Sequence, residues 1–139
     1  MRDPIAPPAA REPVEALQLV SLAVSDGDLD TAVAQYEAGA VLRPWARGPA
    51  TEPTSVAGQL GPLLDLRLPL SLQIGAVLLT DGLALVLGER RMAGADPRRR
   101  PVLLHGAGAT VLRRQPGGIW LIVTDAWCLA GPGEDGHGA

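Results

Sequence analysis

The stretch that decides the fold is TVLRRQPGGIWLIVTDAWC, residues 110–128. It contains the end of one apolar run, residues 102–114, and the whole of another, residues 119–128, with QPGG at 115–118 between them. Pro and Gly between two runs rich in Val, Ile and Trp are typical of a turn that joins antiparallel strands. The sequence therefore predicts a β-hairpin over these residues.

Two more runs of the same kind precede the hairpin, at residues 70–79 and 83–92. The turn TDG at 80–82 separates them, and a loop rich in Pro and Arg at 93–101 follows. Strands that follow each other through short connections are usually neighbours in the sheet. We therefore expect the four strands to form an antiparallel meander.

The residues before the strands have the periodicity of helices. Pro13 suits the first turn of a helix, and Gly27 suits its end. Asp28 is a good N-cap for a second helix, which we expect Gly39 to close. The apolar stripes of these helices are Val14, Leu17, Val20 and Val24 in the first, and Leu29, Ala32, Val33 and Tyr36 in the second.

A short strand at 40–44 and a loop at 46–53 lead to a third helical segment. Thr54 or Ser55 would cap this segment, and Pro62 would kink it or split it in two. Its apolar positions are Val56, Leu60, Leu63 and Leu64. Helices followed by a curved sheet predict an α+β fold.

The chain has the size of one domain, because 139 residues of which 47% are hydrophobic can bury a single core. We expect a flexible N-terminus at 1–12, a folded domain at 13–130 and a flexible tail at 131–139. A net charge of −3 disfavours binding to nucleic acid or to anionic membranes. The single cysteine, Cys128, excludes an intrachain disulfide, and no apolar stretch is long enough to span a membrane, so we expect a cytoplasmic protein.

Three short motifs indicate a relationship: DGDLD at 26–30 between the first two helices, DGLALV at 81–86, and TVLRRQPGGIW at 110–120, which Asp125 follows on the last strand. With the order of elements, they resemble the nuclear-transport-factor-2-like (NTF2-like) superfamily, in its SnoaL-like and ketosteroid-isomerase-like branch. The resemblance implies a cone-shaped, curved antiparallel β-sheet wrapped around N-terminal helices, with an apolar pocket inside.

The resemblance implies two alternative functions. The chain is either a small-molecule pocket protein, working as a cofactor-free isomerase, cyclase or dehydratase on an apolar polyketide- or steroid-like substrate, or a non-catalytic domain for ligand binding or dimerisation. Ketosteroid isomerases carry a catalytic Asp near the first strand, whereas residues 41–47 contain no carboxylate, which gives some support to the second alternative, although the first is the leading hypothesis. In both cases we expect a homodimer through the sheet, because its second apolar face needs cover.

Asp125 and His105 are the candidate catalytic residues. SnoaL-like cyclases keep an acidic residue late in the chain for acid/base catalysis, and the resemblance assigns this role to Asp125. The alternative is a structural Asp that pairs with an Arg such as Arg113. His105 would either orient a substrate oxygen or be a hydrogen-bonded core histidine. Its predicted strand face carries residues that leave space beside an imidazole, namely Ala107, Ala109 and Val111.

Five further residues are candidates for the ligand-binding wall: Tyr36, Trp45, Gln73, Glu89 and Trp127. Alternation along the strand puts Glu89 and Arg91 on one face and Arg90 on the other. Glu89 would then lie at the pocket mouth. The alternative interpretation is a solvated strand end.

The acidic residues of the chain do not predict a metal site. Asp26, Asp28, Asp30 and Glu37 match positions 1, 3, 5 and 12 of a calcium loop, but Thr31 occupies the position that requires Gly. Helix capping is therefore the preferred interpretation of this run. Because His and Cys are few and scattered, we predict neither a metal nor another cofactor.

Overall fold

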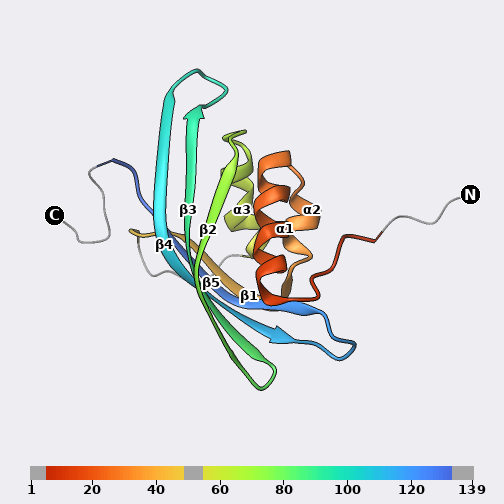
Figure 1. The fold of residues 1–139 in the computed structure, drawn as a ribbon. Coiled ribbons are helices and arrows are strands. Elements are labelled where there is room, and N and C mark those ends of the chain that lie inside the picture. Colours follow the sequence, from red (N-terminus) through yellow and green to blue (C-terminus); the bar gives the residue numbers. More distant parts are fainter. Residues whose placement is uncertain (1–5, 49–54, 133–139) are drawn as a thin grey trace, which may run out of the picture.

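The computed structural model describes residues 6–48 and 55–132 of the chain. Three helices and five strands follow one another in the order of an α+β domain (Figure 1). The helices are α1 (Pro13–Asp26), α2 (Leu29–Val33) and α3 (Val56–Leu64). The strands are β1 (Tyr36–Trp45), β2 (Leu70–Thr80), β3 (Leu83–Ala95), β4 (Pro101–Arg114) and β5 (Trp120–Leu129).

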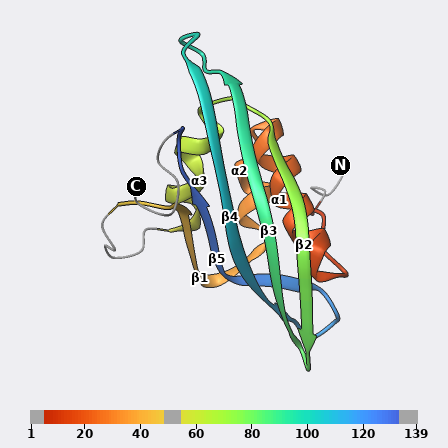
Figure 2. The ribbon, with the colours of Figure 1, turned by 60° about the vertical axis from the view of Figure 1, so that its left-hand side comes forward.

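The five strands form one curled sheet in the order β1-β5-β4-β3-β2. β2, β3, β4 and β5 are antiparallel neighbours, which confirms the predicted meander. β1 pairs with β5 in parallel, so the sheet is mixed at this edge and not antiparallel throughout as predicted. All three helices lie against one side of the sheet, called the inner face below, and Figure 2 shows the opposite, outer face in front of them.

The first strand begins earlier than the sequence pattern predicts. α2 ends at Val33 and β1 starts at Tyr36, whereas the pattern indicates a helix up to Gly39. The backbone carbonyl of Gln35 accepts a hydrogen bond of 2.8 Å from the amide of Ile122, which holds this segment beside β5. Gly39, with φ of 80°, lies in the irregular first part of β1 and makes a bulge there instead of ending a helix.

The helix ends follow the sequence signals. Pro13 is the first residue of α1, and Gly27 follows its last residue in the left-handed conformation, with φ of 73°. Asp28 and Ser55 cap α2 and α3, since each side chain accepts a hydrogen bond from the backbone N–H three residues further on. Pro62 lies inside α3 and does not split it. None of these helices has the length and apolar character needed to cross a bilayer.

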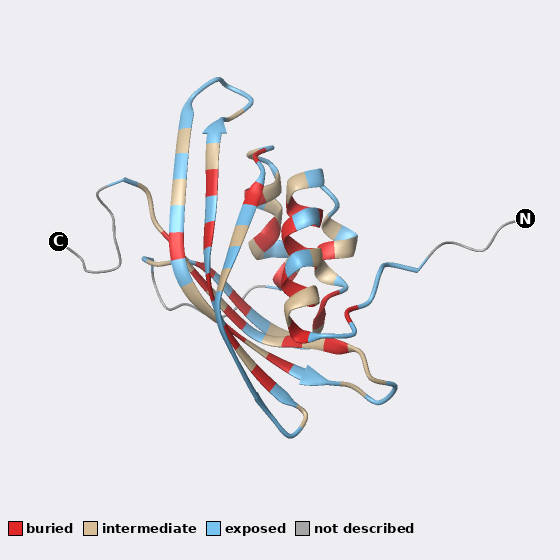
Figure 3. Cartoon of the chain, viewed as in Figure 1, coloured by how far each residue is buried: buried red, intermediate tan, exposed pale blue. Residues whose placement is uncertain are grey.

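The core lies between the inner face and the helices, where buried residues of both layers meet (Figure 3). Its side chains come from every strand of the sheet and from all three helices. The largest fully buried ones are Trp127, Leu17, Leu42, Leu60, Leu63, Met92, Leu112, Ile122 and Leu129.

Two glycines allow β4 to bend closely over β5. A Cβ atom at Gly106 would overlap the backbone carbonyl of Cys128, and one at Gly108 would overlap that of Ala126. Cys128 has a positive φ of 58° at the same place. Backbone atoms cannot move aside as the end of a flexible side chain can, so this part of the curvature requires glycine.

The described part of the predicted flexible N-terminus contacts the domain. The amide of Trp120 donates a hydrogen bond of 2.9 Å to the carbonyl of Ala10, and the Gln35 side chain donates one of 2.9 Å to the carbonyl of Pro8. Ala10 is only 1% exposed. Residues 1–5 and 133–139 of the predicted flexible ends lie outside the described residues.

Candidate functional site

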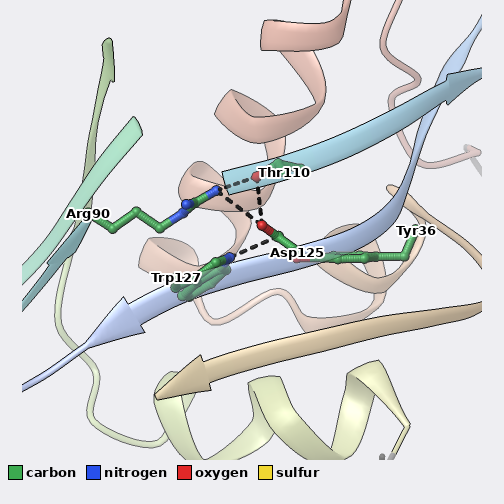
Figure 4. Close-up of polar contacts among 5 residues, drawn as sticks. All are labelled: Tyr36, Arg90, Thr110, Asp125 and Trp127. Atoms are coloured by element: carbon green, nitrogen blue, oxygen red, sulfur yellow. Dashed lines mark hydrogen bonds and ion pairs between the residues drawn. The ribbon is translucent and has the colours of Figure 1, made fainter. Parts of the chain in front are cut away.

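Asp125 is the centre of a buried polar network on the inner face (Figure 4). Its Oδ2 accepts hydrogen bonds of 2.8 Å from the Tyr36 hydroxyl and 2.8 Å from the Trp127 indole N–H. Its Oδ1 accepts a hydrogen bond of 2.6 Å from the Thr110 hydroxyl. The three donors come from β1, β5 and β4, so the carboxylate joins three strands of the sheet.

Arg90 on β3 supplies the counter-charge of this network. Its Nη2 lies 3.7 Å from Oδ1 of Asp125 and donates a hydrogen bond of 3.4 Å to the Thr110 hydroxyl. Its guanidinium lies 4.8 Å from the centre of the Trp127 ring, within the range of a cation–π contact. Arg90 is 2% exposed, and a buried carboxylate of this kind requires such a partner.

The arginine beside Asp125 is not the expected Arg113 but Arg90. Arg113 pairs instead with Glu37, at 2.9 Å between Nε and Oε2, near the surface. The signal for Arg90 was present in the sequence, because strand alternation puts it on the face opposite to Glu89 and Arg91, among apolar side chains. A lone cation on a core face needs a buried carboxylate, and among the described residues Asp125 is the buried carboxylate that supplies it.

The network also changes the pKa of the Tyr36 hydroxyl. Burial raises the pKa of Tyr36 well above its ordinary value of 10.0, and the charge of Asp125 and its hydrogen bond raise it further, against a smaller opposing effect of Arg90. Tyr36 therefore stays a donor at neutral pH. Both carboxylate oxygens of Asp125 already accept protein hydrogen bonds, and the side chain is 0% exposed.

The structure does not bring together the two candidate catalytic residues, Asp125 and His105. Asp125 lies opposite Thr110 in the register of β4 and β5. Thr110 and His105 are separated by an odd number of positions on β4, which places their side chains on opposite faces. Thr110 is fully buried, whereas His105 is exposed on the outer face, opposite Arg91 of β3.

The predicted site residues thus fall into two groups. Tyr36 and Trp127 join Asp125 on the inner face as hydrogen-bond donors rather than as the walls of a pocket. On the outer face, His105 joins the two predicted wall residues of the neighbouring strands, Gln73 and Glu89. Trp45 lies at the end of β1, 38% exposed, and takes part in neither group.

Two adjoining hollows mark the outer face. The central hollow, about 570 Å³, is floored by small residues, namely Gly75, Gly88, Ala107, Gly108, Ala109 and Ala126. The polar hollow, about 520 Å³, is lined by Ser71, Gln73, Glu89, Arg91 and His105 among others. Gln73 and Glu89 line both, so the hollows meet at these two side chains. His105 lines the polar hollow, whereas Ala107 and Ala109, which share its strand face, line the central one.

The acidic run at 26–30 belongs to a helix cap. Asp28 accepts a hydrogen bond of 3.1 Å from the amide of Thr31, as the capping interpretation predicts. A third hollow of about 400 Å³ lies between the end of α1 and the end of α3, beside Asp26 and Asp65. Within residues 6–48 and 55–132, no three His, Cys, Asp or Glu side chains are grouped so as to hold a metal ion.

No known family model matches the chain, and no curated protein matches its sequence. Solved structures do resemble it. A conserved protein from Planctomyces limnophilus superposes with a TM-score of 0.72 at 13% identity, over 85% of this chain and 93% of that one. A ketosteroid-isomerase-like protein from Erwinia carotovora gives 0.68 at 16% identity, over 86% and 94% of the two chains.

A proposed calcium/calmodulin-dependent protein kinase type II association domain from Thiobacillus denitrificans gives a TM-score of 0.67 at 14% identity, over 89% of this chain and 98% of that one. Identities this low establish a shared fold and leave the reaction open. The fold of this chain is that of the ketosteroid-isomerase-like and NTF2-like proteins, as its sequence motifs indicate.

Proposed function

We propose that this chain is a non-catalytic association domain that forms a homodimer through the outer face of its sheet. The observation that carries the proposal is the large apolar side chains exposed on that face. They alternate along β3 with the buried residues of the inner face and continue onto the neighbouring strands. Five exposed large hydrophobic residues belong to this face: Val41, Leu78, Leu83, Leu87 and Leu103.

The lower part of the face forms a continuous apolar band, made of Leu78, Leu83, Leu85, Leu87 and Val111. Register connects its members, because Leu78 lies opposite Leu85 and Leu85 lies opposite Val111. Contiguous apolar surface is uncommon on monomers and is typical of interfaces between copies of one chain. A two-fold axis would bring the same band of two copies together, since such an interface is self-complementary.

The inner face supports the non-catalytic half of the proposal. A general acid or base must come within hydrogen-bond reach of a substrate proton. The carboxylate oxygens of Asp125 instead accept hydrogen bonds from Tyr36, Thr110 and Trp127 inside the core. The same carboxylate forms an ion pair with Arg90. The isomerase, cyclase or dehydratase alternative would require this network to open at the cost of an unpaired buried arginine.

The fold also agrees with a role in association. The structure from Thiobacillus denitrificans, described as a proposed association domain, covers nearly all of this chain's domain. At 14% identity this is a likeness of fold, so the assembly of this chain stays part of our proposal.

Light scattering behind a size-exclusion column tests the proposal at micromolar concentration. The wild-type chain should have twice the chain mass of 14.4 kDa. Leu78→Glu places a charge in the apolar band, where the side chain is 55% exposed, and should give the mass of one chain. Leu22→Glu is the matched control, because Leu22 is 62% exposed on α1, away from the sheet, and should leave the dimer intact.

A wild-type protein that elutes with the mass of one chain would refute the homodimer. A dimer that survives Leu78→Glu but not Leu22→Glu would place the interface on the helices instead. Thermal melts of both variants check that they are folded, since surface substitutions of this kind change stability little.

A further inference from the structure

Two rows of polar side chains cross the upper part of the outer face. In one row, Gln73 of β2 lies opposite Glu89 of β3. In the other, Ser71 lies opposite Arg91, and Arg91 lies opposite His105 of β4. Both rows line the polar hollow, and the first row borders the central hollow as well.

Glu89 and Arg91 bring opposite charges to one side of this site. They are two positions apart on β3, so their side chains leave the strand about 7 Å apart and on the same face. Both are exposed, and neither forms an ion pair with another side chain of the described residues. The pair therefore offers one anionic and one cationic contact, separated by the size of a small dipolar head group.

The central hollow continues the site with apolar surface. Glu89 lies opposite Ala107 of β4. Because the side chain of Ala107 is small, it does not separate the charged rows from the central hollow. Ala109 and Ala126, which lie opposite each other on β4 and β5, extend the floor. A volume of about 570 Å³ lies within the range of small-molecule sites.

We propose that the two hollows together bind a small zwitterion with an apolar tail, the chemistry of a free α-amino acid with a large apolar side chain. Its ammonium group would contact Glu89 and the side-chain oxygen of Gln73. Its carboxylate would contact Arg91, whose planar fork suits a carboxylate, and His105. Its side chain would lie over the alanine floor.

Singly charged ligands fit the same site less well. A carboxylate without an ammonium group would gain Arg91 but would face the charge of Glu89. An amine without a carboxylate would gain Glu89 but would face Arg91. A zwitterion without a tail would leave the alanine floor wet and lose the hydrophobic contribution to binding.

Titration calorimetry with four probes tests the proposal on the full chain. L-phenylalanine should bind saturably, while 3-phenylpropionate, phenethylamine and glycine should each bind about tenfold more weakly or worse, since each lacks one charge or the tail. Heteronuclear NMR should show L-phenylalanine shifting the amide resonances of Gly88 and Gly108, which lie under the hollow. No saturable binding of L-phenylalanine or of L-leucine would overturn the proposal.

Charge-neutralising variants separate this site from unspecific binding. Glu89→Gln should lower the affinity for L-phenylalanine. It should leave the affinity for 3-phenylpropionate unchanged or raise it, because the repelling carboxylate is gone. Arg91→Gln should lower the affinity for L-phenylalanine but not the affinity for phenethylamine. Arg113→Gln, which removes another exposed arginine of the sheet, is the control and should change none of these affinities. Equal effects of Arg91→Gln and Arg113→Gln would contradict the assigned contacts.

The binding site borders the proposed dimer interface, because Leu87 of the apolar band also lines the central hollow. Leu78 lies outside both hollows, so the monomeric variant Leu78→Glu should still bind L-phenylalanine, at least as tightly as the wild-type chain. If the wild-type chain is a monomer and still prefers L-phenylalanine over the singly charged probes, the association proposal fails and the binding proposal stands. If the wild-type chain is a dimer and shows no preference among the probes, the binding proposal fails and the association proposal stands.

Discussion

Tyr36 on β1 and Asp125 on β5 are joined by a hydrogen bond of 2.8 Å between the phenolic hydroxyl and Oδ2. It spans the parallel strand pair of the described sheet and ties its edge strand to the interior. Through the other oxygen of Asp125 the same network reaches Thr110 on β4 and Arg90 on β3. The carboxylate therefore links four strands of the sheet.

Replacement of Asp125 by Asn should destabilise the protein strongly. Asp125→Asn keeps the shape of the side chain but removes its charge, so Arg90 becomes an unpaired buried cation. We expect the free energy of unfolding to fall by roughly 3–5 kcal/mol, measured by urea denaturation at neutral pH.

Glu37→Gln is the matched control, because it neutralises a carboxylate whose partner Arg113 is 53% exposed. Solvent screens that pair, so its loss should cost less than about 1 kcal/mol. If Asp125→Asn proved as stable as the wild-type protein, or more stable, the charge would be held at some cost to stability, as in a functional carboxylate. The catalytic interpretation of Asp125 would then return.

Arg90 and Asp125 should be energetically coupled. Arg90→Met keeps a long side chain against Trp127 but leaves the charge of Asp125 unpaired. The double variant with Asp125→Asn removes both charges, so its loss of stability should be smaller than the sum of the single losses by about 0.5–3 kcal/mol. Denaturant unfolding of the four proteins in this cycle measures the difference. Additive losses would show that Arg90 and Asp125 act separately.

The sequence predicts well those elements whose signals are local. Turn residues at 80–82 and 115–118 delimit strands at nearly their observed positions, and Asp28 caps α2 as expected. The start of β1 could not be found in this way. The pattern of Tyr36 fits the apolar stripe of a helix, and the extended conformation there depends on pairing with β5, far away in the sequence.

The same limit applies to the candidate site. Alternation along one strand correctly separates Arg90 from Glu89 and groups His105 with small residues. It does not tell which face of one strand matches which face of the next, because that depends on register and on the bulges between strands. The sequence alone therefore does not show that Asp125 and His105 lie on opposite faces of the sheet.

Two glycine substitutions should change stability in opposite directions. Gly108→Ala adds a Cβ that meets the backbone of Ala126, so part of β4 or β5 must move, and we expect a loss of about 1–3 kcal/mol. Gly61→Ala lies in α3, where a Cβ would meet nothing within 4 Å, and should stabilise the protein by about 0.5–1 kcal/mol. Thermal and urea unfolding of both variants measure the two effects. If Gly108→Ala left the free energy of unfolding unchanged, the backbones of β4 and β5 would not be in close contact at this position.

Alkaline titration should report on Tyr36 with little interference. The chain has one tyrosine and no lysine, so few other side chains titrate where tyrosine ordinarily does, near pH 10. Burial first, and then the charge of Asp125, raise the pKa of Tyr36 in the folded state well above 10.0. The unfolded chain therefore releases this proton near pH 10 while the folded protein keeps it.

The free energy of unfolding should consequently keep its full Tyr36 contribution below pH 10. Above that pH it should fall by up to about 1.4 kcal/mol per pH unit, because the unfolded state then binds fewer protons. Tyr36→Phe should remove this fall, whereas Cys128→Ser should not. Near-ultraviolet absorbance gives a second measurement, since tyrosinate should form only as the protein unfolds. Tyrosinate that formed reversibly near pH 10 in the folded protein would show that water reaches Tyr36 and that the network around Asp125 is open.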